Sequence, residues 1–314
     1  MVRTKIAQIV YRPPRCRYSL NEIPYSQISS SGAEIINETV CFPNNRGMDI
    51  KGSFFRAEKR AEGNPCVIYL HGNASSQLEG MFLPYSCSPL GVSVLCIDLS
   101  GSGLSDGENI GLGYFEKDDV ECAIGFLRSR FDIGKVFLWG RSMGATTALW
   151  CSSMNMDICG IISDSPFLSV KEILNDLIGD SWILWLLSKA VYPVIDSAVV
   201  KNGGFSMNDV DISAILKNAG VPAMFIHAES DTFIRSRQSL DAFTLYGDQR
   251  KFVQTTKGTH NSKRPVSVII TAIEFMAQVL ELRETSLDIQ NTNIDDNSSS
   301  HYTNVSDLFN HMKK

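Results

Sequence analysis

Several features that would indicate particular classes of protein are scarce or missing. The chain has 314 residues and a formal net charge of −5, which gives no reason to expect nucleic-acid binding. None of its eight cysteines belongs to a C-x-x-C pair, so neither a zinc ribbon nor a thioredoxin-like redox motif is indicated. We therefore expect reduced thiols in a cytoplasmic protein, and we expect neither a metal nor an organic cofactor.

The sequence also lacks long apolar runs. The first residues, MVRTKIAQIVYRPP, lack the apolar core of a signal peptide. The longest apolar stretch surrounds residues 182–187 and is far shorter than the roughly 20 residues that span a bilayer, so we predict no transmembrane helix. The basic residues near the start precede the first acidic residue, Glu22. They are Arg3, Lys5, Arg12, Arg15 and Arg17. We interpret these residues as a solvated face, and weak peripheral contact with an anionic membrane is the alternative.

Short apolar runs alternate with helical patterns through the middle of the chain. Continuous apolar runs of this length suit strands that are buried on both faces of a sheet. Helical patterns at residues 120–131 and 266–280 complete an alternation that predicts an α/β fold, with a mostly parallel central sheet flanked by helices. Residues 34–40 and 48–56 alternate more strictly and predict antiparallel strands at the leading edge. The apolar runs are residues 66–70, 93–98, 135–140, 159–165, 222–227 and 251–256.

One long segment interrupts this alternation. Residues 168–218 separate two predicted strands by more than a normal crossover and contain the apolar cluster SWILWLLSKAVYPVI. This composition predicts a helical cap inserted into the domain. We assign residues 1–283 to one α/β domain that includes the cap, and we predict that the polar residues 284–314 are disordered.

The pattern G-x-S-x-G occurs twice and offers two candidate nucleophiles. In such an elbow the serine sits on a tight strand-to-helix turn, where its hydroxyl is exposed. Ser142 directly follows the predicted strand 135–140 and precedes the helix-forming run ATTALWCSS. Ser105 lies seven residues after the strand end at Asp98, inside a Gly/Ser-rich loop where no helix begins. We therefore predict Ser142 as the nucleophile and interpret Ser105 as part of a loop that borders the site.

A nucleophilic serine needs a neighbouring base, and the chain has only five histidines. His260 lies in a loop between the last predicted strand and the last helix, from which it reaches the carboxyl end of a parallel sheet. The base in turn needs a carboxylate, which follows the serine and precedes the histidine in the chain. Asp231 fits this order best, and Glu229 and Asp164 stay as competitors. The remaining histidines are His71, His227, His301 and His311.

The negatively charged oxygen of a tetrahedral intermediate needs two N–H donors. We predict the backbone N–H of Met143, the residue after the nucleophile, as one donor. The loop after the strand 66–70 reads His-Gly-Asn-Ala, and the backbone N–H of Asn73 in this loop is the predicted second donor.

These motifs resemble those of a known group of enzymes. The runs CVIYLHGNASS, CIDLSGSGLSDG, LWGRSMGATTAL, FIHAESDTFI and KGTHNSKRP are similar to the α/β-hydrolase superfamily, and more narrowly to serine-aminopeptidase-type hydrolases with an HGNA loop and a GRSMGA elbow. The same broad group includes eukaryotic protein depalmitoylases, whose PP-x-x-x-Y segment is similar to YRPPRCRYSL. The resemblance covers residues 8–283. Only Cys16 lies near the start, which argues against the cysteine-rich, lipidated N-terminus of the depalmitoylases.

The resemblance and the candidate residues together favour a serine hydrolase. It would cleave a carboxylic ester or thioester of a small-molecule or acylated substrate through an acyl-enzyme on Ser142. Trp182, Trp185 and Leu186 of the predicted cap are candidates for lining an acyl groove, and docking of the cap onto the domain is the alternative. Two other functions stay open. One is a small serine peptidase, which needs a carboxylate near the nucleophile for the substrate amino group. The other is an inactive hydrolase fold used as a binding scaffold.

Overall fold

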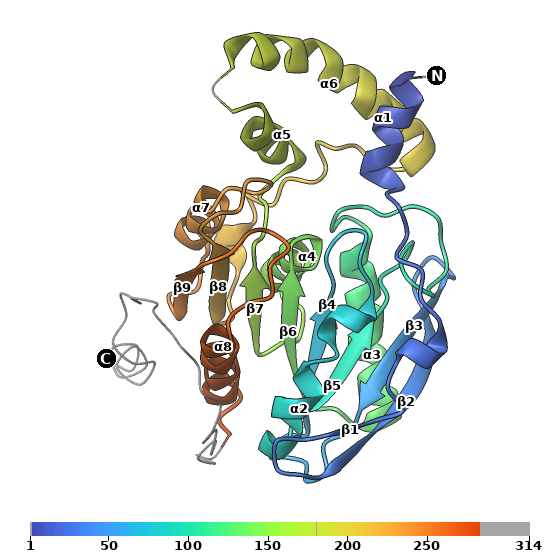
Figure 1. Ribbon diagram of the computed structural model, residues 1–314, viewed down its shortest axis with the longest axis vertical. Coiled ribbons are helices and arrows are strands. Elements are labelled where there is room, and N and C mark those ends of the chain that lie inside the picture. The colour runs from blue at the N-terminus through green and yellow to red at the C-terminus, as the bar shows by residue number, and fades with distance from the viewer. Residues whose placement is uncertain (1, 180, 283–314) are drawn as a thin grey trace.

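A mixed sheet forms the centre of the protein (Figure 1). The computed structural model describes residues 2–179 and 181–282, so the predicted disordered tail, residues 284–314, lies outside the described residues. The strand order is β1-β2-β3-β5-β4-β6-β7-β8-β9, in which β1, β2 and β3 form an antiparallel edge and the others run parallel to one another. This topology confirms the predicted mostly parallel sheet. The strands are β1 (Ser26–Ile28), β2 (Glu34–Pro43), β3 (Asp49–Phe55), β4 (Pro65–Leu70), β5 (Ser93–Ile97), β6 (Lys135–Arg141), β7 (Gly160–Asp164), β8 (Ala223–Ala228) and β9 (Lys251–Thr256).

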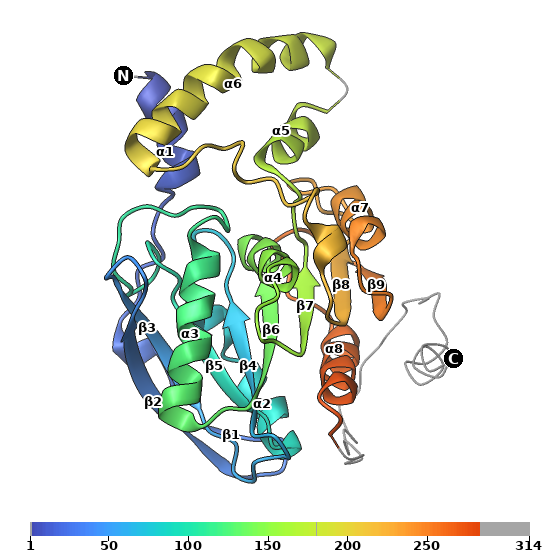
Figure 2. The same cartoon turned by 180° about the vertical axis from the view of Figure 1, so that it is seen from behind.

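Helices cover both faces of the sheet, as a comparison of Figures 1 and 2 shows. Side chains of each strand alternate between the two faces. In β4, Cys66, Ile68 and Leu70 pack on one side and Val67 and Tyr69 on the other, which is why the sequence run is apolar throughout. One face carries α2 (Leu83–Cys87) and α8 (Val266–Val279), and the other carries α3 (Glu116–Phe131), α4 (Met143–Ser153) and α7 (Arg237–Leu245). Short 3-10 turns lie at Leu20–Glu22, Gln77–Gly80, Ser88–Leu90 and Leu216–Asn218.

The segment between β7 and β8 holds the two helices of the insertion, α5 (Val170–Ile178) and α6 (Trp182–Gly203). Both lie beyond the carboxyl ends of the parallel strands (Figures 1 and 2). The apolar segment is longer than the stretch predicted around residues 182–187. The 22 residues of α6 include an 18-residue window with a mean hydropathy of 1.6, which is long and apolar enough to cross a membrane. The predicted length was too short because the apolar run continues past Lys189 with few charged residues.

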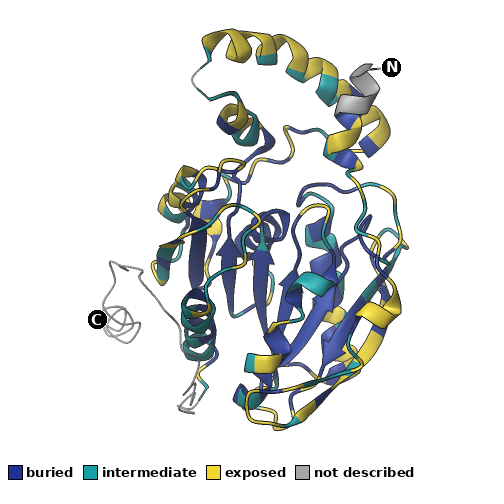
Figure 3. Ribbon diagram, in the orientation of Figure 1, coloured by how far each residue is buried: buried dark blue, intermediate teal, exposed yellow. Residues whose placement is uncertain are grey.

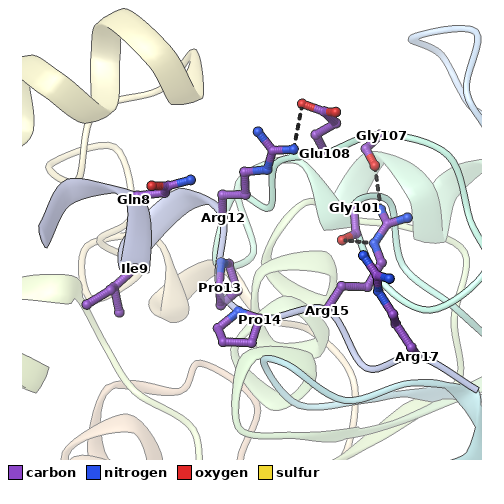
Figure 4. A pocket seen from close by; sticks show the side chains of 10 residues that line it. All are labelled: Gln8, Ile9, Arg12, Pro13, Pro14, Arg15, Arg17, Gly101, Gly107 and Glu108. Atoms are coloured by element: carbon purple, nitrogen blue, oxygen red, sulfur yellow. Dashed lines mark hydrogen bonds and ion pairs between the residues drawn. The ribbon is translucent and has the colours of Figure 1, made fainter. Parts of the chain in front are cut away.

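The basic N-terminal segment is docked onto the body of the protein, and only part of it is a solvated face. α1 (Val2–Tyr11) packs along α6, and the chain then follows the loop after β5. Figure 4 shows Arg12 paired with Glu108 at 3.0 Å, and Arg15 donating to the carbonyl oxygens of Gly101 and Gly107. Arg17 remains exposed. The sequence pattern did not indicate these contacts, because their partners, the Glu108 carboxylate and two backbone carbonyls, lie far along the chain.

Tyr18 anchors the end of this segment. Its hydroxyl donates to Asp98 Oδ2 at 2.5 Å and accepts from Gln77 Nε2 at 2.6 Å. Burial, together with the neighbouring Asp98 carboxylate, raises the pKa of Tyr18, so the phenol stays protonated and keeps donating. Asp98 also accepts from the backbone N–H groups of Gln77 and Leu104, which ties the segment to two loops near the carboxyl end of the sheet.

Replacing Tyr18 with Phe removes this donor and leaves a buried carboxylate oxygen short of one partner. We expect Tyr18→Phe to lower the free energy of unfolding by about 1–3 kcal/mol. Tyr25→Phe is the matched control, because Tyr25 is 76% exposed and its loss of a hydroxyl should change little. Urea unfolding followed by circular dichroism measures both, and equal stability of the two variants would contradict the anchoring role.

Candidate active site

Ser142 occupies a strained turn between β6 and α4. Its backbone has φ 52° and ψ −115°, a conformation that non-glycine residues rarely adopt. The Ser142 N–H donates to the carbonyl oxygen of Asp164 at 2.8 Å, which holds the turn against the end of β7. This strand–turn–helix context is the one predicted for the nucleophile elbow.

The two glycines of the elbow are required by close backbone approach. A Cβ on Gly140 would lie 2.1 Å from the carbonyl oxygen of Gly144, and a Cβ on Gly144 would lie 2.0 Å from the carbonyl oxygen of Leu70. Both distances are far below van der Waals contact, and the clashing atoms are backbone atoms that have no rotamer to escape into. The first turn of α4 therefore packs directly on β4 and β6, and this packing fixes the position of Ser142.

The structure brings the three predicted residues Ser142, His260 and Asp231 together. His260 Nε2 lies 3.0 Å from Ser142 Oγ, and His260 Nδ1 lies 2.6 Å from Asp231 Oδ2. Because an ionised carboxylate only accepts, Nδ1 carries the proton and Nε2 is the acceptor that faces the serine hydroxyl. The geometry provides a base within reach of the nucleophile and a carboxylate that orients the base.

Several donors converge on Asp231. Its Oδ1 accepts from the backbone N–H groups of Phe233 and Ile234 at 2.9 and 2.8 Å, and the buried His227 ring lies 3.4 Å from Oδ2. Burial by itself raises the pKa of Asp231, but the hydrogen bonds from His227, His260 and Ile234 outweigh it, and the pKa lies below the usual range. Asp231 is therefore a carboxylate at neutral pH, as an orienting acid must be.

The other two candidate acids, Asp164 and Glu229, form contacts outside the triad. Asp164 is bound by Arg264, whose Nε and Nη2 each lie 2.8 Å from one of its oxygens. Glu229 is exposed and accepts from Thr255 Oγ1 at 3.3 Å. Arg264 also donates to the carbonyl oxygens of Thr259 and Ser262, so the Asp164 pair secures the loop that carries His260.

The other described histidines have structural contacts. His71 is buried, and its Nε2 accepts from the N–H of Leu99 at 3.1 Å. His227 is buried between Ser239 Oγ, at 2.6 Å, and the carbonyl oxygen of Ile234, at 2.9 Å. His301 and His311 lie outside the described residues. The part played by His227 beside Asp231 was missed, although its place four residues before Asp231 was visible in the sequence.

Arg141 and Glu79 form a frame around the site that sequence reasoning also missed. Arg141 Nη1 lies 2.8 Å from Glu79 Oε1, and Arg141 Nη2 donates to the carbonyl oxygen of His260 at 2.6 Å. Glu79 Oε2 accepts from the N–H of Gly72 at 3.0 Å. Burial lowers the pKa of Arg141, but the carboxylates of Glu79 and Asp164 raise it more, so the guanidinium keeps its charge. One ion pair thus links the elbow, the His260 loop and the Gly72–Asn73 loop.

The two predicted N–H donors belong to residues beside Ser142, one next to it in the chain and one in the same cavity. Met143 is the first residue of α4, so its N–H has no acceptor within the helix. Asn73 lines the same cavity as Ser142 and precedes Ala74, whose φ of 56° marks a tight turn in this loop. Their action on a developing oxyanion stays a prediction.

A cavity of about 830 Å³ opens at Ser142 and His260. Its lining is mixed: Leu78, Phe233 and Cys16 contribute apolar surface, while Glu79 and Arg141 contribute charge. Within the described residues, no group of three or more His, Cys, Asp or Glu side chains is arranged to hold a metal ion.

The predicted groove residues of the cap do not line this cavity. Trp182, Trp185 and Leu186 are 72%, 47% and 56% exposed, and they lie on the outer half of α6. The prediction assumed that the cap folds down over the site. Instead, α6 extends outward from its contact with α1, so its first turns meet neither the site nor the sheet.

The second serine motif is structural, in agreement with its interpretation as a loop. Ser105 Oγ donates to the carbonyl oxygen of Asp98 at 2.5 Å and accepts from the N–H of Lys51 at 2.8 Å. Its hydroxyl is buried and engaged on both sides, without a histidine partner.

Solved structures of esterases share this architecture. The Pyrococcus furiosus esterase Pf2001 has a TM-score of 0.60 at 17% identity, with 86% of this chain and 97% of that chain covered. The family model for serine aminopeptidase, S33, matches residues 63–208. This chain therefore has the fold of the α/β-hydrolases, and its residues 63–208 are similar to the serine aminopeptidase family. The family match includes Ser142. Because it ends at residue 208, the assignments of Asp231 and His260 rest on the geometry alone.

Two curated relatives extend this comparison. The uncharacterized protein YqkD of Bacillus subtilis is 28% identical over 195 residues, which are 61% of this chain and 62% of that protein. Lysophosphatidylserine lipase ABHD12 of Rattus norvegicus is 23% identical over 234 residues, which are 68% of this chain and 52% of that protein. This chain therefore spans less than two thirds of the length of each of these relatives.

The elbow glycines provide a test of the packing that positions the nucleophile. We expect Gly144→Ala to lower the free energy of unfolding by about 1–3 kcal/mol, because the new methyl group collides with the backbone of Leu70. Gly125→Ala is the control: no atom lies within 4 Å of its Cβ position in α3, and alanine should stabilise that helix by about 0.5–1 kcal/mol. Urea unfolding measures both, and a Gly144→Ala variant as stable as wild type would contradict the close approach.

Proposed function

We propose that this protein is a serine hydrolase that cleaves carboxylic esters or thioesters through an acyl-enzyme on Ser142. The observation that carries the proposal is the continuous hydrogen-bonded chain from Asp231 through His260 to Ser142, which ends in a cavity large enough for a small-molecule substrate. The family match over residues 63–208 supports a hydrolase. The names of an esterase and a lysophosphatidylserine lipase among the similar proteins support an acyl substrate.

The reaction follows from the proton positions. As Ser142 Oγ attacks the carbonyl carbon, His260 Nε2 takes the hydroxyl proton, and the Asp231 carboxylate stabilises the imidazolium that forms. The N–H groups of Met143 and Asn73 would stabilise the negative oxygen of the tetrahedral intermediate. Collapse of the intermediate releases an alcohol or thiol, which receives the proton from His260. A water molecule then attacks the acyl-enzyme with the same base and releases the acid.

The cavity favours an acyl substrate over a peptide with a free amino terminus. An aminopeptidase needs a carboxylate that is available to the substrate ammonium group. Glu79 lines the cavity, but its two oxygens are occupied by Arg141 and by the N–H of Gly72. Leu78 and Phe233 provide apolar surface that suits an acyl chain. The complete triad argues against an inactive scaffold.

We also propose that the protein works in a reducing compartment such as the cytoplasm. All eight cysteines are free thiols, and burial raises the pKa of Cys66, Cys87, Cys96 and Cys151, which keeps them protonated and unreactive.

Hydrolysis of p-nitrophenyl esters and acyl thioesters of increasing chain length tests the proposal. We expect wild type to hydrolyse short esters, and we expect Ser142→Ala to lower kcat/KM by about 10⁴-fold or more, because the nucleophile is lost. The variant should keep the wild-type circular dichroism spectrum. Hydrolysis by Ser142→Ala at the wild-type rate would show that the proposed reaction does not occur at this serine.

The acid is tested separately by two isosteric variants. We expect Asp231→Asn to lower kcat by about 10³–10⁴-fold, because an amide cannot hold His260 in the tautomer that accepts the serine proton. Glu229→Gln changes the exposed competitor two residues away and should leave kcat within about twofold of wild type. A larger loss in Glu229→Gln than in Asp231→Asn would assign the acid to Glu229.

A further inference from the structure

We propose that the first half of α6 docks this protein on a lipid bilayer by inserting into the apolar part of one leaflet. Six consecutive apolar residues, from Trp182 to Leu187, are each 47–72% exposed. In Figure 3 this part of α6 forms a continuous exposed rod at the outer edge of the molecule. In the 18-residue apolar window of α6, only 6% of the residues are buried, so the helix is not a core helix of this chain.

The distribution of these side chains favours lipid over a protein partner. An α-helix turns once in about 3.6 residues, so six consecutive residues point in all directions around its axis. A helix that docks in a protein groove presents one apolar stripe and keeps a polar opposite face. The segment 182–187 has no polar face, and lipid chains, unlike a protein surface, can surround it on every side. The hydrocarbon chains of a lipid bilayer therefore fit this segment better than a protein groove does.

The second half of α6 sets the depth of insertion. Ala198, Val199 and Gly203 are buried, and the Cβ position of Gly203 lies 2.9 Å from Tyr11 Cβ of α1. Asp196 accepts hydrogen bonds from Ser206 Oγ and the N–H of Met207. Although the whole helix is about 33 Å long, enough for a hydrocarbon core of about 30 Å, spanning would strip these contacts. The exposed segment 182–187 is about 9 Å long, much shorter than a hydrocarbon core of about 30 Å, so it can enter one leaflet only.

Basic side chains border the apolar segment. The Lys189 ammonium lies 3.6 Å from the centre of the Trp185 ring, one turn along the helix, and Lys171 of α5 lies 5.7 Å from the ring of Tyr192. Lysines whose stems run along aromatic surface place their charge at the level of lipid headgroups. Among the described acidic residues near this segment, Glu172 pairs with Arg237, and Asp196 accepts from its own loop. Anionic headgroups should therefore strengthen binding.

Docking through α6 would turn the active site toward the membrane. Both views of the fold place α6 beyond the carboxyl ends of β6 and β8, the strands that lead to Ser142 and Asp231 (Figures 1 and 2). Resting on the proposed function, this placement points to acyl lipids of the leaflet as the substrate class. The docking itself does not depend on that function.

Vesicle flotation with the full chain tests the docking. The vesicles are phosphatidylcholine alone, or equal parts of phosphatidylcholine and phosphatidylserine. The variant Trp182→Asp/Leu186→Asp places charge in the segment, and Tyr25→Asp/Leu20→Asp is the matched control, because its two residues are as exposed but lie in the segment before β2. We expect wild type and control to float with the mixed vesicles, and we expect at least a tenfold loss of the bound fraction in the α6 variant.

Tryptophan quenching by brominated lipids measures the depth. The chain has four tryptophans; Trp139 and Trp150 are buried in the core, so quenching reports on Trp182 and Trp185. Bromine near the headgroup end of the acyl chains should quench more than bromine near the chain ends. Stronger quenching from the chain ends would overturn insertion into one leaflet.

Two further outcomes would overturn the docking. One is the absence of wild-type binding to either vesicle. The other is a wild-type dimer that the α6 variant abolishes without any vesicle binding, which would assign this surface to a second copy of the chain. Hydrolysis of p-nitrophenyl acetate without vesicles reports on the active site independently. Wild type that floats but does not hydrolyse would refute the proposed function and keep the docking. Wild type that hydrolyses but does not float would refute the docking and keep the proposed function.

Discussion

The direct packing of α4 on the carboxyl ends of β4 and β6 is the constraint on which the site depends. Gly140 and Gly144 allow backbone atoms to approach so closely that Ser142, between them, is held in a strained conformation with a positive φ. The strain at Ser142 is held by the hydrophobic contacts of the surrounding sheet, because β4, β6 and α4 are almost completely buried. A nucleophile placed by a rigid core needs only its base and its acid to be brought to it by loops.

Chemically identical side chains take different roles because their surroundings differ. Asp231 accepts from two backbone N–H groups and the His260 imidazole, with His227 3.4 Å away, whereas Asp164 is neutralised by Arg264. His260 stands in the cavity beside a serine, while His71 is buried with backbone partners on the sheet. The Arg264 pair and the Arg141 contact both hold the His260 loop, so charges beside the triad position the base without taking part in the proton transfer.

The fold and the triad could be predicted because their signals are local. Apolar runs for strands, a serine at a strand–helix junction and the chain order of Ser142, Asp231 and His260 all lie within short segments. The contacts of Arg15, and those of Arg141 with Glu79, could not be predicted, since they join residues about 60–90 positions apart through geometry alone. The exposure of α6 was also hidden, because the same apolar run fits a buried helix, a lid or a membrane-binding helix.

Labelling with a fluorophosphonate probe, followed by peptide mapping, tests the central claim that the triad activates Ser142. Such a probe reacts with a serine only when a neighbouring base removes its proton and the site accepts a tetrahedral centre. The account predicts a single phosphonyl group on the peptide that contains Ser142, which is retained in Ser105→Ala and absent from Ser142→Ala. A folded wild type that resists labelling, or a label on Ser105, would contradict it.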